Sequence, residues 1–263
     1  MSGSGEEIVR YHFEDFTETG YRDIIRLARR RWTFIPYERF REPGMVCLWR
    51  HDIDFSTHRA LRMACIERDE GVRATYFVHL HSAFYHPLDP ENADRIRRIV
   101  AMGHDIGLHF DVRFYGDLFS NADPEVLAGR ILFFLKLERE LLEKTFECSI
   151  RSFSLHNPDF KAFRQIDDDE VEGMVNAYSR HLRDRYAYVS DSNGYWRFAR
   201  LRDLLEAGTE QRLHVLTHPG WWTPEAMSPR DRISRCIEGR AASQHRYYDC
   251  LILESGRENI GKA

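Results

Sequence analysis

The sequence lacks the signals of several large protein classes. Its five cysteines are odd in number and include no Cys-x-x-Cys pair, so neither a disulfide framework nor a cysteine-based zinc site is indicated. Cys47, Cys65 and Cys250 adjoin apolar residues, as reduced thiols in a protein core do. We therefore expect the protein to work in a reducing compartment.

Membrane and nucleic-acid signals are also missing. No apolar run approaches the roughly 20 residues that cross a bilayer, and the first residues show neither the basic region nor the apolar core of a signal peptide. With a net charge of −4, the chain lacks the basic excess of a nucleic-acid-binding protein. A cytoplasmic protein with no membrane span and no nucleic-acid partner is predicted. The oligomeric state is left open.

A missing glycine-rich loop and two clusters of basic residues bear on the class of ligand. A Gly-x-Gly-x-x-Gly loop is absent, which disfavours an oxidoreductase or nucleotide-binding domain. Basic residues do cluster at 29–31 and 95–98. We interpret both clusters as solvated helix faces, with a phosphate-bearing substrate as the alternative.

Strand-like and helix-like patterns alternate along the 263 residues. Strands are expected at 45–53, 74–78, 105–109, 149–155, 187–190 and 213–217, and helices at 21–32, 57–70, 92–102, 123–145, 200–207 and 229–241. This alternation predicts an α/β fold, a distorted (β/α)7-type barrel with parallel strands, rather than an open doubly wound sheet. One domain spans 1–263, with loose ends at 1–7 and 255–263. Residues 247–253 are expected to form a final strand or a packed tail, and 167–170 a solvated loop.

Two acidic residues follow the first buried strand. Asp52 and Asp54 lie at its end and project to the same side, because side chains alternate along a strand. Two carboxylates this close resist ionising together unless a cation or a hydrogen-bond network intervenes. Capping of the next helix is the alternative, but it explains one aspartate, and Ser56 and Thr57 could cap equally well.

Ligand-type side chains follow the other predicted strands as well. They are His79 and His81, His109 and Asp111, His156, Asp191, and His218. In a parallel barrel these ends share one face, where active sites gather. Taken singly, each histidine is more often a structural group. Together they predict a site that combines a metal with acid–base chemistry.

The order of these segments resembles the polysaccharide deacetylases, the NodB-homology group of carbohydrate esterase family 4, and especially their short branch linked to surface-polysaccharide biosynthesis. Arg50-His-Asp-Ile-Asp54 looks like the first motif of that family. The resemblance implies that Asp52 is the general base and Asp54 a metal ligand. Gly103-His-Asp-Ile-Gly-Leu-His109 is similar to the second motif, whose last histidine is a ligand.

Two later segments extend the resemblance. Residues 188–196 look like the fourth motif, with Asp191 orienting a catalytic histidine, and residues 216–222 look like the fifth, with His218 as the general acid. Trp196, Trp221 and Trp222 are then candidates for substrate stacking, against the alternative that they pack in the core or at its rim.

One position departs from the family pattern. The second motif normally has another ligand histidine four residues after the first, and here that residue is Arg113. Arginine stays protonated and offers no lone pair, so Arg113 is assigned to substrate binding instead. His156 is the first choice for the third ligand, followed by Asp111 and His81. A plain loop histidine at His156 is the alternative.

The resemblance implies a metal-dependent hydrolase that removes an acetyl group from a sugar or glycan intermediate. Zinc is the first choice for mixed histidine and carboxylate ligation, with nickel, cobalt or iron as alternatives. An N-acetyl group is favoured over an O-acetyl group. Two other functions stay open: a related amidase or deformylase acting on another amide, and a non-catalytic relative that binds glycan.

Overall fold

The computed structural model describes residues 10–118, 123–157 and 166–261. In these residues one sheet of nine strands runs through the molecule, in the order β6-β7-β5-β4-β3-β2-β9-β8, with β1 paired to β2 beside this path. The strands are β1 (Thr33–Phe34), β2 (Val46–Ile53), β3 (Thr75–Val78), β4 (Asp105–Phe110), β5 (Ser152–Leu155), β6 (Glu170–Val171), β7 (Met174–Asn176), β8 (Ala187–Ser190) and β9 (Arg212–Thr217).

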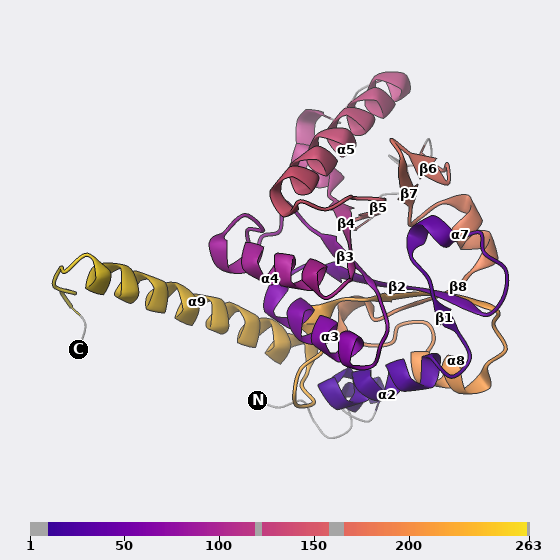
Figure 1. The fold of residues 1–263 in the computed structure, drawn as a ribbon, viewed down its shortest axis with the longest axis horizontal. Coiled ribbons are helices and arrows are strands. Elements are labelled where there is room, and N and C mark those ends of the chain that lie inside the picture. Colours follow the sequence, from indigo (N-terminus) through magenta and orange to yellow (C-terminus); the bar gives the residue numbers. More distant parts are fainter. Residues whose placement is uncertain (1–9, 119–122, 158–165, 262–263) are drawn as a thin grey trace.

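The sheet is parallel except for the β6–β7 hairpin. It curls into a half-barrel with helices on its outer side (Figure 1). The helices are α2 (Glu18–Ala28), α3 (Thr57–Asp69), α4 (Pro90–Ala101), α5 (Pro124–Phe146), α7 (Arg180–Arg185), α8 (Leu201–Ala207) and α9 (Pro229–Glu254). The predicted α/β class and barrel-like parallel sheet are confirmed. The antiparallel hairpin at one end was not predicted.

The central strand β2 carries the sequence segment that ends in the two aspartates. Every residue of β2 is buried, and the strand pairs with β3 on one side and β9 on the other. Burial on both faces accounts for the continuous apolar run that begins this segment. The predicted strand at 45–53 therefore agrees with β2 to within one residue.

A close approach between β3 and β4 depends on glycine. A Cβ atom at Gly107 would lie 2.5 Å from the Phe77 ring and 3.1 Å from the backbone oxygen of Ser152. These distances leave no room for a side chain. Gly107 thus allows β4 to bring His109, two residues later, into line with its neighbours on β3 and β5.

The largest error in the predicted elements concerns the last helix. Residues 247–253 form neither a strand nor a packed tail, because α9 continues to Glu254. Figure 1 shows that this helix leaves the body of the molecule and projects to one side. Smaller errors are at the helix starts: α2 begins at Glu18, three residues before the predicted start, because the Thr17 hydroxyl caps it by accepting the Gly20 N–H. Among the described residues, no helix is both long and apolar enough to span a membrane.

Candidate metal centre

Three side chains from three strand ends meet at one edge of the sheet. Asp54 follows β2, His109 is the fifth residue of β4, and His156 follows β5. Parallel pairing places β4 beside β5 with His109 opposite Ser154, and the His156 N–H continues the ladder by donating to the Phe110 carbonyl. The shared edge predicted from the sequence therefore exists, and it brings Asp54, His109 and His156 together.

The three donor atoms fit a divalent cation. His109 Nε2 lies 3.1 Å from Asp54 Oδ1 and 3.1 Å from His156 Nδ1, and His156 Nδ1 lies 3.4 Å from Asp54 Oδ1. Ligand bonds of about 2.0–2.1 Å in a tetrahedral zinc site place neighbouring donors about 3.3 Å apart. The three observed separations match such a triangle. Moreover, Asp54 Oδ1 is buried without a well-aligned hydrogen bond, which a cation between the donors would remedy.

The charges of the three side chains also favour a bound cation. Burial alone would raise the pKa of the Asp54 carboxyl, but the imidazoles of His109 and His156, with His218 beyond them, hold that pKa well below its usual range. Conversely, burial lowers the pKa of the His156 imidazole, and Asp54 outweighs it, so the net shift is upward. The site therefore keeps an ionised carboxylate and attracts positive charge.

The other ring nitrogen of His109 connects the metal ligands to Asp52. His109 Nδ1 lies 2.6 Å from the Ser154 hydroxyl, and that hydroxyl donates to Asp52 Oδ1 at 3.4 Å. On its far side, the Asp52 carboxylate accepts from the buried guanidinium of Arg50 at 3.1 Å. Arg50 is itself held by the Tyr178 hydroxyl, 2.9 Å away. Asp52 is thus a buried, partnered carboxylate next to the ligand His109.

The pair of His218 and Asp191 lies on the opposite side of the centre. The Asp191 carboxylate accepts the His218 backbone N–H at 3.0 Å and lies 2.6 Å from His218 Nδ1, while His218 Nε2 faces Asp54 Oδ2 at 3.8 Å. Burial lowers the pKa of the His218 imidazole, but Asp191, with Asp54 and Asp52 behind it, raises it to about 9. His218 therefore carries a proton near neutral pH and presents Nε2 to the centre.

The remaining candidates for a third ligand lie farther from the donor triangle. His81 Nε2 is 2.8 Å from Glu138 on α5, and its ring stacks on Phe114. Asp111 accepts the backbone N–H of Arg113 at 2.9 Å. The Arg113 side chain is exposed on the 3₁₀ segment that follows β4. His156 is therefore the candidate whose position completes a site with Asp54 and His109.

A second donor set overlaps the first. His79, Asp111 and His156 also lie close enough to share an ion, with His79 Nε2 3.6 Å from Asp111 Oδ2. His79 is 4% exposed, and neither of its ring nitrogens has a hydrogen-bond partner in the described residues. Because both sets need His156, an ion in one set competes with an ion in the other for that ligand.

The predicted aromatic residues take different positions. Trp222 is fully buried, and its indole N–H donates to Asp191 at 2.9 Å, so it supports the His218 pair and has no surface to offer a sugar. Trp196 is half-buried, donates to Asp15 at 2.9 Å and packs on Phe16. Trp221 is also half-buried, and its ring packs edge-on against another aromatic ring at the rim. A sugar contact is therefore left to Trp196 and Trp221.

Two contributors to the site, Arg50 and Ser154, were not assigned a role from the sequence, and they hold Asp52 and His109. His79, predicted among the ligand-type residues at the strand ends, belongs to the second donor set. Arg50 and Ser154 lie in segments predicted to be buried strands. Arg50 is two positions before Asp52, and Ser154 is two positions before His156. That spacing of two residues was the available signal, because it places side chains on one face of a strand.

Comparisons with known proteins give fold-level likeness only. No protein-family model matches the sequence, and no curated protein matches it. A polysaccharide deacetylase structure from Bacillus cereus is 15% identical, with a TM-score of 0.43, over 76% of this chain and 89% of that chain. A peptidoglycan N-acetylglucosamine deacetylase catalytic domain from Eubacterium rectale is 13% identical, with a TM-score of 0.44, over 76% and 86%. A mutant of a Bacillus anthracis CE4 family pseudoenzyme, with restored activity, is 12% identical, with a TM-score of 0.40, over 74% of this chain and only 63% of that chain.

Fold and site together define a parallel, barrel-like α/β protein with two histidines and an aspartate at the carboxyl ends of its strands. In the order of its sequence motifs the chain resembles the polysaccharide deacetylases of carbohydrate esterase family 4. Similarity of the degree found in the solved structures assigns no activity, so the function is argued from the site itself.

Proposed function

We propose that this protein is a metal-dependent hydrolase that removes an acetyl group, N-acetyl rather than O-acetyl, from a sugar. The observation that carries the proposal is the convergence of Asp54, His109 and His156, with the Asp52 carboxylate 3.7 Å from His109 Nδ1 and the His218 imidazole 3.8 Å from Asp54 Oδ2. Hydrolysis of an amide needs those parts: an activated water, a stabilised oxyanion and a proton for the leaving nitrogen.

Asp54, His109 and His156 would hold the metal. Zinc is the first choice for this mixed set of nitrogen and carboxylate donors, and nickel, cobalt and iron suit the same ligands. A divalent ion bound there acidifies a water and polarises the acyl oxygen. The Ser154 hydroxyl fixes the ring orientation of His109 through Nδ1, so that Nε2 points to the other two donors.

Asp52 would act as the general base. Its carboxylate lies 3.7 Å from His109 Nδ1, close to the donor triangle without belonging to it. The Arg50 guanidinium and the Ser154 hydroxyl occupy two of its acceptor positions and fix its orientation. Asp52 accepts a proton from the attacking water, and the resulting hydroxide adds to the acyl carbon.

His218 would act as the general acid. Asp191 binds its Nδ1 and its backbone N–H, so the ring cannot rotate away. The proton on Nε2 then passes to the leaving nitrogen as the C–N bond breaks, giving acetate and the free amine. Because its pKa is about 9, His218 is charged before the reaction and can serve as a proton donor at neutral pH.

The substrate class follows from the same reasoning. Trp196 and Trp221 offer ring surface for a sugar, and the exposed Arg113, on the segment that follows β4, offers a polar contact. The role in surface-polysaccharide biosynthesis and the cytoplasmic location expected from the sequence stay predictions.

The test is turnover of acylated sugars by protein loaded with zinc, nickel, cobalt or iron in turn. We expect acetate and free amine in equal amounts from an N-acetylated sugar, with loss of both in Asp52→Asn and in His218→Gln. A panel of N-formyl, O-acetyl and cyclic amide compounds separates a deformylase or amidase from a deacetylase. Glycan binding by the parent without any turnover, retained in Asp52→Asn, would replace the proposal with that of a non-catalytic glycan-binding protein.

A further inference from the structure

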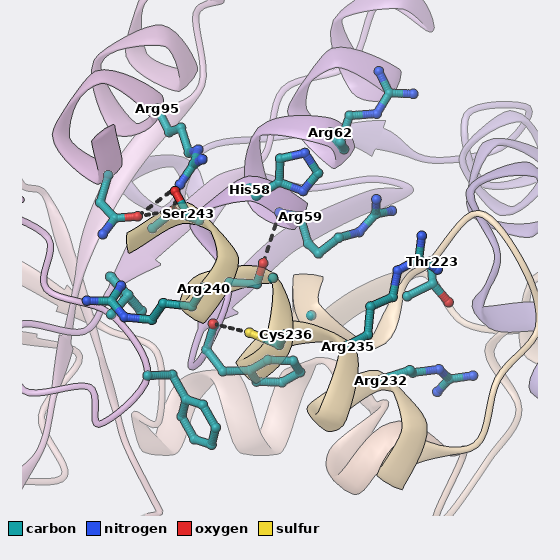
Figure 2. Close-up of a pocket in the computed structure, with 18 of the residues that line it drawn as sticks. His58, Arg59, Arg62, Arg95, Thr223, Arg232, Arg235, Cys236, Arg240 and Ser243 are labelled. Atoms are coloured by element: carbon teal, nitrogen blue, oxygen red, sulfur yellow. Dashed lines mark hydrogen bonds between the residues drawn. The ribbon is translucent and has the colours of Figure 1, made fainter. Parts of the chain in front are cut away.

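A large pocket lies outside the metal centre, between the start of α3, α4 and the first half of α9 (Figure 2). Its volume is about 620 Å³, which is in the range of sites for small organic ligands. Phe55 and Gly220 form part of its wall. Phe55 directly follows the metal ligand Asp54, and Gly220 lies two residues after His218, so the pocket is next to the metal centre without including it.

Positive charge dominates this pocket, which we call the arginine pocket. Two acidic residues line it, Glu18 and Glu91. The cationic residues of its lining are Arg59, Arg62, Arg95, Arg232, Arg235, Arg240 and Arg246. They come from three helices that are far apart in the sequence. Only the fold brings them together, and their number far exceeds that of the carboxylates.

The carboxylates leave much of this charge uncompensated. Arg59 and Arg62 share the single carboxylate of Glu18, at 2.9 and 2.8 Å. Arg240 reaches Asp89 only at 3.8 Å, and Arg235 pairs with the exposed Glu225 at the rim. Arg59 is largely covered and also donates to the Trp222 carbonyl at 2.5 Å, whereas Arg62 and Arg235 are exposed, and exposed ion pairs contribute little. The Arg62 and Arg235 guanidinium groups are therefore available to an incoming anion, beside the fixed charge of Arg59.

The arginines of the pocket differ in where their side chains point. Figure 2 shows Arg59 and Arg235, from α3 and α9, converging beside Thr223. Arg232 points away from that group and is buried, with its guanidinium donating to the Gly194 and Phe13 carbonyls. Arg232 therefore anchors α9 to the domain and is not available to a ligand in the pocket.

Two further observations indicate an anion. Ser56, which caps α3 by accepting the Arg59 N–H at 3.2 Å, lines the pocket together with the first residues of the helix, and the start of a helix favours negative charge. Within the pocket, burial followed by the nearby Arg59, Arg95 and Arg62 lowers the pKa of His58. Burial is the larger cause of this lowered pKa, and the three arginines add to it because positive charge lies close to the imidazole.

The rest of the lining is aromatic and apolar. Phe55 and Phe84 pack with their ring centroids 5.8 Å apart, and Tyr85 and Cys236 line the same region. A bare inorganic ion would leave this part of the pocket empty. The combination fits a ligand with a charged end for the arginines and a carbon framework for the rings.

We propose that the arginine pocket binds an organic phosphate, with the phosphate or diphosphate on Arg59, Arg62 and Arg235 and the carbon framework against Phe55 and Phe84. Phosphate is favoured over a carboxylate because it carries more charge and matches several guanidinium forks at once. The ligand is either the phosphorylated part of the sugar substrate or a separate phosphorylated metabolite. The phosphate site itself does not depend on the proposed deacetylation.

The first experiment measures binding of inorganic pyrophosphate to the full-length, metal-free protein by calorimetry. We compare the parent with Arg62→Gln/Arg235→Gln, and use Arg230→Gln/Arg257→Gln as the control, because that pair removes two exposed arginines that do not line the pocket. Loss of two charge-assisted contacts should weaken binding at least about tenfold. The control should change it less than about twofold.

Equal binding by the two double variants, or no binding by the parent, would overturn the proposal. Thermal unfolding of each variant checks the fold. Should the first pair fail to fold, Arg235→Gln alone is used, and a loss of affinity of at least about threefold is expected.

The second experiment distinguishes the two sources of the phosphate. It compares KM for N-acetylglucosamine 1-phosphate and for N-acetylglucosamine in the parent and in Arg62→Gln/Arg235→Gln. A rise in KM for the phosphorylated sugar alone identifies the substrate as the source. Unchanged KM values beside weakened pyrophosphate binding identify a separate metabolite. Failure of the proposed function would appear as no turnover of either sugar, while the pyrophosphate result stands on its own.

Discussion

His109 and Ser154 are partners in register on neighbouring parallel strands, and the Nδ1 atom of His109 lies 2.6 Å from the Ser154 hydroxyl oxygen. The same hydroxyl donates to Asp52. One serine therefore supports both a metal ligand and the proposed base, and it ties the orientation of the imidazole to that of the carboxylate.

We expect Ser154→Ala to weaken zinc binding by about 10- to 100-fold, the usual effect of removing a hydrogen-bond partner from a ligand histidine. Competition with a chelator of known affinity measures the change. Ser190→Ala is the matched control, because Ser190 is also a buried serine near a strand end but bonds to Ser192 rather than to a ligand. Equal zinc affinity in Ser154→Ala and the parent would contradict the role assigned to this hydroxyl.

The two overlapping donor sets make a prediction about stoichiometry. Because both require His156, we expect one tightly bound ion per chain and loss of more than about 100-fold in affinity in His156→Ala and in Asp54→Ala. His79→Ala should retain the ion, and so should His81→Ala. Elemental analysis after gel filtration gives the ratio. Retention in Asp54→Ala with loss in His79→Ala would instead place the ion in the set formed by His79, Asp111 and His156.

The titration of His218 should depend on Asp191. In metal-free protein the His218 pKa is about 9, and Asp191→Asn should lower it toward the ordinary value of about 6.5. The folded pKa lies above the unfolded one, so this pair stabilises the fold fully below about pH 6.5, and the stabilisation is lost as the pH rises through about 9. NMR of the imidazole protons follows the pKa directly. In denaturant unfolding, the free energy of unfolding of the parent should fall between pH 6 and 10, and that of His218→Gln should not show this fall.

A buried network below the centre should matter for stability rather than for the reaction. The fully buried Glu67 carboxylate accepts from the Tyr21 and Tyr76 hydroxyls and lies 2.6 Å from His51 Nε2. Burial raises its pKa, but His51, His104 and Tyr21 outweigh burial, so the pKa lies below its usual value. Its stabilisation is therefore present above the unfolded pKa of about 4.3 and is lost as the pH falls through the lower folded value.

We expect Glu67→Ala to lower the free energy of unfolding by about 3–5 kcal/mol, because it leaves His51 and two tyrosine hydroxyls without their partner. Urea unfolding at neutral pH measures the change. Glu206→Ala, at an exposed carboxylate on α8, is the control and should stay within about 0.5 kcal/mol of the parent. If the free energy of unfolding changes as little in Glu67→Ala as in Glu206→Ala, the network contributes little to stability.

The parts of the site that sequence reasoning found were those set by local pattern. Asp52, Asp54, His109, Asp191 and His218 each lie at or just after a short apolar run, and the common direction of parallel strands was enough to bring such positions to one edge. The choice of His156 over His81 followed from the same argument, and the donor distances agree with it.

The parts that were missed depend on contacts between distant segments. Whether Trp222 faces a sugar or the core is decided by Phe16 and Tyr21, which pack on it from the start of the chain. The basic cluster at 95–98 reads as a solvated helix face, yet Arg95 lines a pocket shared with α3 and α9. No periodicity within one element reports which element will lie opposite it.

His156, the third donor, comes from the end of β5 and not from the segment after β4. This affects the connection between β4 and β5. That connection holds the 3₁₀ segment Val112–Leu118 and α5, and it supplies no atom to the donor triangle. Its length and composition can therefore diverge, or be exchanged by grafting, while the ion-binding geometry is preserved by the ends of β2, β4 and β5. Because the end of β5 supplies this ligand, the segment beside the metal centre can change in this chain without loss of an ion-binding residue.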